Sequence, residues 1–396
     1  MKIVKNVALA CAAVLVWLPD ALTQSTEAPA GFDNLTNGFL SQAELDSARS
    51  VFEEREGLAD GLGPVYNAQA CAECHQTPIS GATSQVTELR AGHFSPRRGF
   101  QDPPGGSLIN DRAISAAFQE VVPPGNEVRT QRTSLNTLGD GFVECIADNT
   151  LRAISQNQPA TMRGQVIMVP VLEAPGVTRV GRFGWKDQHA SLVSFSADAY
   201  LNEMGITTPL PFFPQDNTSN GRVVDDGIAD PEDDGADVEV FASFMRSTKA
   251  PAPDPALAST QAAQAGSALF NSVGCVTCHV RSILTAKPGT VINGGTFTVP
   301  PALGDKVIHP FSDFLLHDVG TGDGIVQNGP ATTRTKLRTV PLWGLRTRSR
   351  FMHDGLSVTL GDAIQRHGGE AASVTDAYHR LSPSRRNQLL AFLGSL

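Results

Sequence analysis

The chain has CAECH at residues 71–75 and CVTCH at residues 275–279, so the same Cys-x-x-Cys-His pattern occurs twice in 396 residues. In a c-type haem site, two thiols one short turn apart bond to the porphyrin, and the following His ligates the iron. Two Cys-x-x-Cys pairs can also hold zinc, but a His directly after the second Cys in both copies favours haem. We predict two covalently bound haem c groups. Their attachment residues are Cys71, Cys74, His75, Cys275, Cys278 and His279, with His75 and His279 as iron ligands.

Residues 1–23 are predicted to be a secretory signal peptide. Lys2 and Lys5 give a basic start, and the apolar run VALACAAVLVWL follows at Val7–Leu18. This run is short for a membrane span, and no other segment is as apolar, so the mature chain should lack an integral membrane segment. Because c-type haem is attached outside the bacterial cytoplasm, we expect a periplasmic or otherwise exported protein.

Charge and cysteine usage limit the partners. The formal net charge is −9 and basic clusters are absent, which argues against nucleic acid and anionic membranes and suits a small basic redox protein as electron donor. Cys11 lies in the predicted signal peptide, so only Cys145 stays outside the haem motifs and no disulfide framework is expected. Cys145 is interpreted as a buried small hydrophobe, with an axial thiolate or redox centre as the alternative.

Helix signals accompany both motifs. Ser41 and Glu44 fit a capping box ahead of CAECH, and an apolar helical face follows over residues 45–52. Ahead of CVTCH, either Ser259 or Thr260 can cap a second helix. A helix, a Cys-x-x-Cys-His motif, loops and a terminal helix make up the plan of a cytochrome c.

The second of these helices is predicted to cross another one closely. Gly266 and Phe270 lie four residues apart on one face, and a small residue next to an aromatic one suits such a crossing. The terminal helix has Ser382 as its cap and Pro383 at its first position. We therefore predict a mainly α fold with two cytochrome c-like haem domains.

The domains are predicted at residues 31–249 and 258–396, separated by the semi-rigid linker APAPDPA at 250–256. The N-terminal domain is enlarged by loops and by a small β-hairpin, because β-branched residues at 166–171 and 177–180 flank a Pro-Gly turn.

Eight carboxylates lie between residues 225 and 239. We interpret them as a solvated loop that leads into a helix at Val238–Arg246, whose N-terminus favours negative charge. The alternative is a Ca²⁺ site, since oxygen ligands are plentiful there.

The second axial ligand of each iron must come from elsewhere in the chain. The remaining histidines are His93, His189, His309, His317, His353, His367 and His379. Three of them stand out. His353 lies in RFMHDG, and His317 lies in DFLLHDVG, where Asp318 can orient a neighbouring group. His367 ends the predicted helix TLGDAIQRH, and the two glycines after it let the ring approach a porphyrin without backbone clash. Met352 is the rival, since a Met/His pair raises the reduction potential.

These segments carry a family resemblance. RTVPLWGLRTRSRFMHDGLSVTLGDAIQRHGGEA (338–371) resembles the C-terminal signature of the bacterial di-haem cytochrome c peroxidase superfamily. From Gly31 onward the chain resembles the di-haem oxidoreductase family within it, most specifically in GLGPVYNAQACAECH, RFGWKDQHASL, DFLLHDVG and HGGEA. Classical members have Met where this chain has His367, whereas the related rubber oxygenases have His. The resemblance implies that His279 and His367 hold the C-terminal haem.

The resemblance also suggests catalytic residues. Superfamily peroxidases can carry a removable distal His shortly after the first motif. His93, eighteen residues after His75, is the candidate, and an open or water-bound iron is the favoured alternative. The peroxidases also place a Gln and a Glu over the open iron to move protons, for which Gln119, Glu120 and Glu144 are the candidates. Trp185, which follows the predicted hairpin, is expected to lie between the haems and to carry electrons; a core Trp is the alternative.

The function that follows is that of an exported di-haem c-type oxidoreductase that is peroxidase-like. H₂O₂ would be reduced at the N-terminal haem with electrons relayed by the C-terminal haem. One alternative is an oxygenase or protein-modifying enzyme that uses O₂ or H₂O₂. A plain electron-transfer cytochrome is another, and a thiosulfate-oxidising cytochrome with Cys145 as ligand is a distant one.

Overall fold

The computed structural model describes residues 25–210 and 217–396. The predicted signal peptide therefore lies outside the described residues. Helical segments make up about 33 % of the described residues and strands about 16 %. The expectation of a mainly α fold is thus wrong in proportion, and the fold is mixed. The 37 glycines and 26 prolines break the chain between the helices into turns and short strands.

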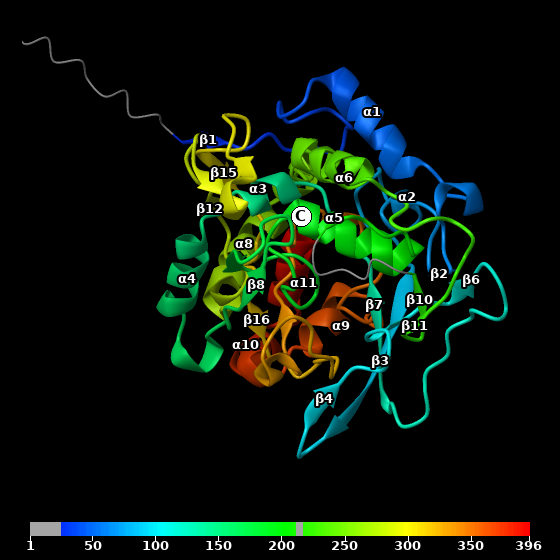
Figure 1. The fold of residues 1–396 in the computed structure, drawn as a ribbon. Coiled ribbons are helices and arrows are strands. Elements are labelled where there is room, and N and C mark those ends of the chain that lie inside the picture. Colours follow the sequence, from blue (N-terminus) through cyan, green and yellow to red (C-terminus); the bar gives the residue numbers. More distant parts are fainter. Residues whose placement is uncertain (1–24, 211–216) are drawn as a thin grey trace, which may run out of the picture.

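The α-helices differ widely in length. They are α1 (Gln42–Glu53), α2 (Cys71–Cys74), α3 (Asp140–Glu144), α4 (Asp148–Asn157), α5 (Leu192–Ala199), α6 (Ala236–Ser247), α7 (Pro255–Ala258), α8 (Gln261–Val273), α9 (Leu360–Gln365), α10 (Ala372–His379) and α11 (Pro383–Leu393) (Figure 1). The 3₁₀ turns are η1 (Leu58–Asp60), η2 (Ala160–Met162), η4 (Cys275–Thr277), η5 (Asn293–Gly295), η6 (Ala331–Thr333), η7 (Leu345–Thr347) and η8 (Gly369–Ala371). One π turn, η3 (Tyr200–Met204), continues α5.

The strands form small separate sheets. They are β1 (Thr26–Glu27), β2 (Val65–Tyr66), β3 (Thr87–Ser95), β4 (Gly99–Gln101), β5 (Leu108–Ile109), β6 (Arg112–Ala113), β7 (Val128–Thr133), β8 (Met168–Pro170), β9 (Thr178–Val180), β10 (Thr218–Ser219), β11 (Arg222–Val223), β12 (Ile283–Leu284), β13 (Val291–Ile292), β14 (Phe297–Thr298), β15 (Lys306–Ile308), β16 (Leu316–His317) and β17 (Leu337–Arg338). In the largest sheet, β3 pairs antiparallel with β4, β5 and β7.

The helix starts follow the predicted capping chemistry. The Ser41 hydroxyl accepts from the Glu44 amide at 3.3 Å, and the Glu44 carboxylate accepts from the Ser41 amide at 2.8 Å. Thr260, rather than Ser259, caps α8. Ser382 caps α11. These side chains accept hydrogen bonds from backbone N–H groups that have no partner inside the helix.

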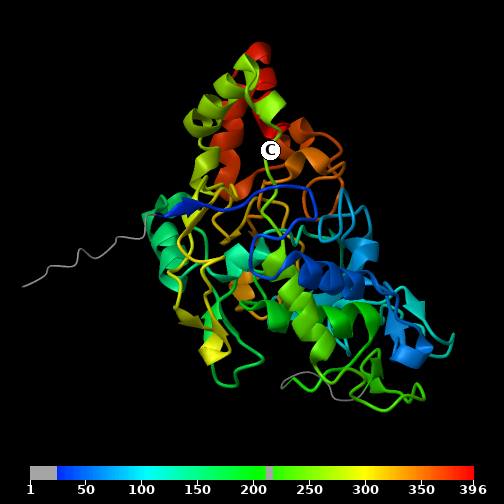
Figure 2. The same ribbon diagram turned by 90° about the horizontal axis from the view of Figure 1, so that it is seen from above.

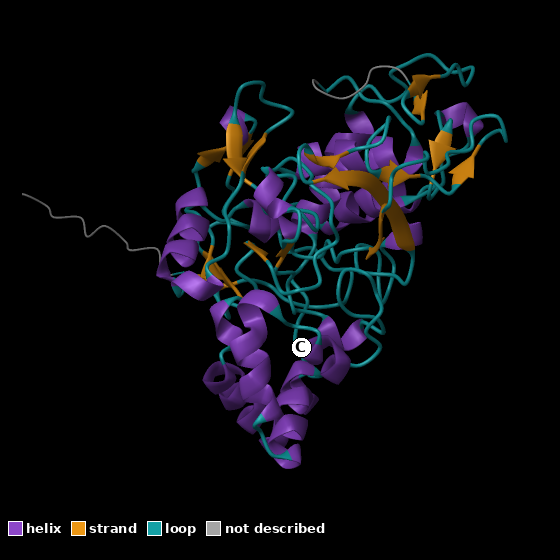
Figure 3. Ribbon diagram, turned by 90° about the horizontal axis from the view of Figure 1, so that it is seen from below, coloured by secondary structure: helices purple, strands orange, loops and turns teal. Residues whose placement is uncertain are grey.

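Two helix groups lie at opposite ends of the molecule, with loops and short strands between them (Figures 2 and 3). At one end α8 packs on α11 around a core that includes Phe270, Leu389 and Phe392. At the other end α1, α5 and α6 pack around the larger core, which contains Phe52 and Phe241. Cys145 is also fully buried in this larger core. No helix of the described chain is both long and apolar enough to cross a bilayer.

The predicted hairpin is present, because β8 pairs antiparallel with β9 and Val169 faces Arg179. Its Val169 packs with Leu316 from the C-terminal half. β1 likewise pairs in parallel with β15. The contact of Val169 with Leu316 joins the two predicted domains, whereas β1 lies before residue 31 and belongs to neither. The boundaries at 249 and 258 stay predictions.

Candidate functional site

The first Cys-x-x-Cys-His motif forms the short helix α2 and ends at His75. The His75 amide donates to the Cys71 carbonyl at 3.0 Å, which closes one turn and leaves both thiols on the same side of it. His75 Nδ1 lies 3.1 Å from the Ala82 carbonyl oxygen. Burial lowers the pKa of His75, so the ring is neutral, donates through Nδ1 and keeps the Nε2 lone pair for a metal.

The second motif repeats this geometry in a 3₁₀ turn. The His279 amide donates to the Cys275 carbonyl at 3.0 Å, and His279 Nδ1 lies 2.9 Å from the Phe311 carbonyl oxygen. Burial, and then the neighbouring His367, lower the pKa of His279 to about 4. Both motif histidines are therefore neutral, oriented by a backbone carbonyl and able to act as metal ligands.

Each motif forms part of the wall of its own cavity. The N-terminal cavity of about 170 Å³ is lined by Cys71, Cys74 and His75. The C-terminal cavity of about 190 Å³ is lined by Cys275, Cys278 and His279. Two thiols and an imidazole at one apolar cavity are the donor set that a covalently attached haem requires.

His367 completes the C-terminal cavity from the opposite wall. Its ring centroid lies 6.4 Å from that of His279. At about 2 Å per metal–nitrogen bond, two imidazoles that share one metal ion have centroids roughly 6 Å apart. His367 Nδ1 lies 2.7 Å from the Ala363 carbonyl oxygen, which again leaves Nε2 free. The residues present therefore fit a haem iron held between two histidines.

The lining of the N-terminal cavity differs from that of the C-terminal one. Among the described residues that line the N-terminal cavity, His75 is the only histidine. Glu88, Arg90 and Glu203 line it as well. Arg90 donates two hydrogen bonds to the Glu88 carboxylate, from Nε to Oε1 at 2.7 Å and from Nη2 to Oε2 at 3.1 Å. A charged, hydrogen-bonded cluster thus forms part of the wall of the N-terminal cavity, whereas His367 forms part of the wall of the C-terminal cavity.

The two carboxyl groups of this cluster differ in protonation. Burial alone would raise the pKa of Glu88, but the Arg90 guanidinium more than offsets it and lowers the pKa to about 2. Burial, and then the negative charge of Glu88, raise the pKa of Glu203 well above its usual range. Glu203 is therefore protonated at neutral pH and hydrogen-bonded to ionised Glu88, and Asn67 Nδ2 donates to Glu203 Oε2 at 2.9 Å.

The sequence analysis missed this carboxyl pair. Glu88 and Arg90 are two apart on β3, so their side chains share one face of the strand, and this was the available signal. Glu203 belongs to the π turn η3 and is brought to Glu88 only by the tertiary fold. π turns are often found at functional sites.

Trp185 lines both cavities. Its indole Nε1 donates to the Thr133 carbonyl at 2.8 Å, and its ring meets that of His353 edge-on with centroids 6.1 Å apart. The side chain is buried and held in one orientation between the two motifs.

The proton-transfer candidates named from the sequence lie elsewhere. The Glu120 carboxylate accepts hydrogen bonds from the backbone N–H of Asn110 at 2.8 Å and of Asn220 at 2.7 Å, and so connects the chain at these two residues. Gln119 donates to the Asn110 carbonyl at 3.2 Å. Neither residue is part of the lining of either cavity.

Two further candidates are also placed away from the N-terminal cavity. Glu144 is buried in a pair with Arg246, with Nε to Oε2 at 2.7 Å. His93 lies near the end of β3 with a partly exposed side chain, and its Nδ1 is 2.8 Å from Glu127 Oε2. His93 is therefore not brought over the N-terminal motif, and Cys145 does not line either cavity.

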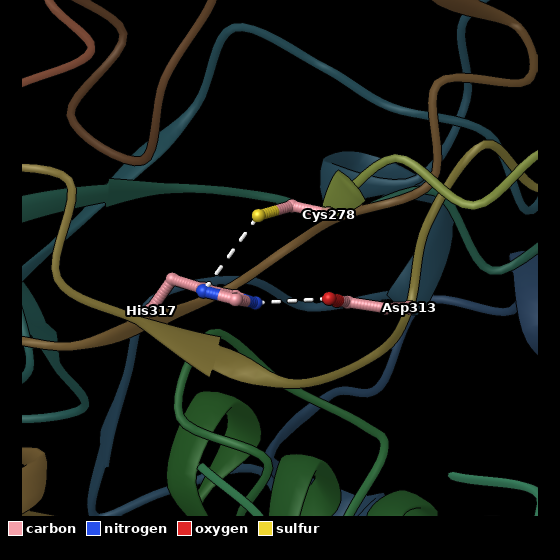
Figure 4. Close-up of side chains that lie close together, drawn as sticks. All are labelled: Cys278, Asp313 and His317. Atoms are coloured by element: carbon pink, nitrogen blue, oxygen red, sulfur yellow. Dashed lines mark hydrogen bonds and ion pairs between the residues drawn. The ribbon is translucent and has the colours of Figure 1, made fainter. Parts of the chain in front are cut away.

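His317 is bound on both ring nitrogens (Figure 4). Nε2 lies 2.9 Å from Asp313 Oδ2, Nδ1 lies 2.7 Å from Glu370 Oε2, and Cys278 Sγ is 3.7 Å from Nδ1. Burial alone would lower the pKa of His317, but these partners raise it to about 12. In this arrangement both ring nitrogens of His317 have carboxylate partners, and neither is left free for an iron.

Met352 and His353 both line the C-terminal cavity. Met352 has a positive φ of 64°, an uncommon conformation for a residue other than glycine. His367, by contrast, has its ring facing that of His279.

Two cavities that each present a Cys-x-x-Cys-His motif fit two haem groups, and a match to a known family agrees with this. Residues 125–396 match the family described as "Di-haem oxidoreductase, putative peroxidase". More than half of the chain is matched, and the chain belongs to this family. It is a haem-dependent, peroxidase-like oxidoreductase.

Several solved structures are similar over nearly the whole chain. Hydrazine synthase of Kuenenia stuttgartiensis is 13% identical with a TM-score of 0.42, covering 100% of this chain and 99% of that one. A MauG-like protein associated with microbial copper homeostasis is 14% identical with a TM-score of 0.43, covering 96% and 95%. The diheme peroxidase BthA from Burkholderia thailandensis is 15% identical with a TM-score of 0.36, covering 94% of each. No curated protein matches the sequence.

Proposed function

We propose that the protein is an exported c-type di-haem peroxidase that reduces H₂O₂ at the N-terminal haem with electrons relayed by the C-terminal haem. The observation that carries this proposal is the difference between the cavities. One has a second histidine, His367, opposite its motif, and the other has the carboxyl pair Glu88 and Glu203. A second protein ligand blocks small molecules, whereas an open face with acid groups suits peroxide.

The proton chemistry is assigned to Glu203 and Glu88. Reduction of one H₂O₂ to two waters consumes two electrons and two protons, and the bound haem supplies the redox chemistry. Protonated Glu203 can give a proton to one peroxide oxygen, and ionised Glu88 can accept one from the other as that O–H bond opens, so the pair moves a proton across peroxide. The two protons consumed overall come from water. Arg90 holds Glu88 in its ionised form and in one position.

His279 and His367 are proposed to hold the C-terminal iron, and His75 the N-terminal one. Trp185 is proposed to carry electrons between them because it lines both cavities. The haems would be attached covalently through Cys71, Cys74, Cys275 and Cys278. Covalent attachment implies export through the apolar start of the chain, and the negative charge suits a basic electron donor.

We also propose that the acidic segment 225–239 binds Ca²⁺. There the carboxylates of Asp226, Asp230 and Glu232 all contact the amide of Asn217. Metal analysis of the purified protein after dialysis against a calcium-free buffer tests this point.

The test of the function is an absorption and EPR study of the purified protein with and without H₂O₂. We expect one low-spin haem that does not bind cyanide and a second haem that does. We also expect the protein to consume peroxide when a reduced donor is added. If neither haem binds cyanide or reacts with peroxide, the electron-carrier alternative is favoured. Oxygen uptake without peroxide turnover would favour the oxygenase.

Covalent attachment is tested by the mass of the mature chain, which should exceed that of the polypeptide by two haem groups. Replacing Cys71 and Cys74 with Ala should remove one haem and keep the other. Zinc in place of haem would overturn the assignment.

A further inference from the structure

The π turn η3 brings a second titratable side chain, Tyr200, to the N-terminal cavity. Tyr200 and Glu203 both lie on this turn and both line the cavity. The proton chemistry proposed for Glu203 does not use Tyr200. Its phenol is directed at a partner behind the cavity wall, Glu56, with the hydroxyl 2.9 Å from Oε1.

Tyr200 and Glu56 form a buried donor–acceptor pair. Their exposed fractions are 3% and 8%. Glu56 is held by Gln69, whose carbonyl oxygen lies 2.7 Å from the Glu56 amide. Burial, and then the negative charges of Asp237, Asp60 and Glu54, outweigh the Tyr200 hydrogen bond and raise the pKa of Glu56 to about 6. Glu56 is therefore mostly ionised at neutral pH and can accept a proton.

Aromatic rings connect Tyr200 to the histidine of the motif. The Tyr200 ring meets Phe241 edge-on at 5.1 Å, Phe241 meets Phe52 at 6.4 Å, and Phe52 lies 6.3 Å from His75, all between ring centroids. These four residues line the same cavity. The phenol thus lies in close-packed contact with the haem site while its hydroxyl faces a proton acceptor.

We propose that Tyr200 and Glu56 form a proton-coupled redox site that holds one oxidising equivalent beside the N-terminal haem. Tyr200 loses one electron toward the cavity, its O–H bond breaks, and a new O–H bond forms on Glu56. The oxidant is H₂O₂, so this inference rests on the proposed function. Of the two electrons that H₂O₂ takes, Tyr200 would supply one and the haem groups the other. A reduced donor later returns the electron, and the proton moves back from Glu56 to the phenol.

The structure suggests why such a site is useful. Peroxide takes two electrons, whereas a relay haem delivers one at a time. A tyrosine that supplies the second electron, and is reduced again by the donor, limits the oxidation of other side chains in the cavity wall. The acceptor is near bulk water, since Glu54 and Arg55 next to Glu56 are exposed.

The test is EPR of the haem-loaded full chain, frozen after mixing with H₂O₂ in the absence of donor. The chain has only three tyrosines, Tyr66, Tyr200 and Tyr378, so each can be replaced in turn. We expect a radical signal that narrows when tyrosine is ring-deuterated. The signal should be lost in Tyr200→Phe and kept in Tyr378→Phe, which alters a buried tyrosine outside both cavity linings.

Glu56→Gln supplies the second variant. The amide keeps the size and a hydrogen-bond acceptor but cannot take the proton, so the tyrosyl signal should also be lost. Haem spectra and thermal melting check that each variant is folded. A tyrosyl signal that persists in Tyr200→Phe, or an undiminished one in Glu56→Gln, overturns the proposal.

Peroxide consumption with an added donor separates this inference from the proposed function. If the wild-type protein consumes peroxide but forms no tyrosyl radical, the redox role of Tyr200 is wrong and the peroxidase function stands. If peroxide does not react with the wild-type protein at all, both are wrong.

Discussion

His367 makes two identical motifs unequal. His75 and His279 have the same neutral ring and the same backbone anchor through Nδ1. The difference lies across the cavity, where His367 faces His279 but no described histidine faces His75. On the proposed ligand assignment, this one side chain would decide which haem is closed to small molecules.

We predict that His367→Ala converts the C-terminal iron from low spin to high spin. Removal of one imidazole leaves that iron with His279 alone, because His317 is engaged on both nitrogens. EPR should show loss of one low-spin signal, while the N-terminal signal stays unchanged.

The matched comparison is Met352→Ala, since Met352 lines the same cavity. It should leave the low-spin signal in place. If Met352→Ala gives the high-spin change and His367→Ala does not, the relay haem is a His/Met haem with a higher potential.

A second prediction concerns the protonated carboxyl group. Glu203→Gln keeps the shape of the side chain but removes its acidic proton, so peroxide turnover should fall by roughly 10²-fold or more. The absorption spectra of both haems should be unchanged. Glu120→Gln serves as the control because Glu120 lies outside both cavity linings, and its turnover should stay near that of the wild type. Equal losses in both variants would contradict the assignment.

At the residue scale the sequence pointed to candidate iron ligands, which stay predictions, but not to the carboxyl pair Glu88 and Glu203. Cys71, Cys74 and His75 are local in sequence, so their spacing alone implies their chemistry. Glu88 and Glu203 are far apart, and only the meeting of β3 with the π turn makes them a pair. The structure places Gln119 and Glu120 outside both cavity linings, and their catalytic role stays a prediction, because the sequence around an isolated carboxyl or amide does not indicate what surrounds it in the fold.

At the scale of elements, the crossing of α8 and α11 depends on Gly266. A Cβ at this position would collide with the Gln388 carbonyl oxygen, which belongs to the backbone of α11 and cannot swing aside. We predict that Gly266→Ala destabilises the protein. An alanine gains about 1 kcal/mol of helix propensity, whereas overpacking costs about 1–3 kcal/mol, and the rigid backbone places this site at the costly end.

Urea unfolding of the haem-loaded protein measures the effect. Gly361→Ala in α9 is the control, because a Cβ there meets only the Thr359 and Tyr378 hydroxyl oxygens at 3.7 and 4.0 Å. It should be neutral or slightly stabilising. A stabilised Gly266→Ala would show that the crossing tolerates more separation than the structure indicates.

Helices and strands were predictable from the sequence where a few adjacent residues specify them. The caps at Ser41 and Ser382 and the β8–β9 hairpin were found from a few adjacent residues. The share of strand was underestimated because strands such as β12 and β16 are two residues long. Such strands exist only through partners distant in sequence, so no alternating pattern marks them.

At the scale of the whole molecule, a buried charge cluster joins the two halves. Asp323 accepts from Arg132 Nη2 at 2.7 Å, and its other oxygen is 2.9 Å from Lys186 Nζ. Lys186 also donates to the Thr333 carbonyl at 2.9 Å. Arg132 lines the N-terminal cavity, and Lys186 follows Trp185, so this cluster fixes the region between the haem sites.

We predict that this cluster makes the protein sensitive to acid. Burial raises the pKa of Asp323, but Arg132 and Lys186 outweigh it and lower the pKa to about 2 from an ordinary value of 3.8. The folded pKa is depressed, so the stabilisation is present above pH 3.8 and lost as the pH falls toward 2. It amounts to about 2 kcal/mol.

Urea unfolding between pH 7 and pH 3 measures it. Asp323→Asn should be less stable at pH 7, since Arg132 and Lys186 lose their shared partner, and should lose less further stability on acidification than the wild type. Parallel curves for the two proteins would contradict this account.

Electron transfer between the sites depends on the region that this cluster holds in place. Trp185 lines both cavities, and its orientation is set by the bond from Nε1 to the Thr133 carbonyl. An indole is easier to oxidise than a phenyl ring of similar packing. We therefore predict that Trp185→Phe keeps both haem spectra but slows inter-haem electron transfer, measured by stopped flow after one-electron reduction.

Trp343→Phe is the matched control for this prediction. Trp343 is a second buried tryptophan, with an exposed fraction of 5%, and it lines neither haem cavity. Loss of an indole from the core alone should lower stability in both variants, whereas only Trp185→Phe should slow the transfer. An unchanged transfer rate in Trp185→Phe would reduce Trp185 to a packing residue, and the electron would then pass through the wall formed by Thr133 and His353.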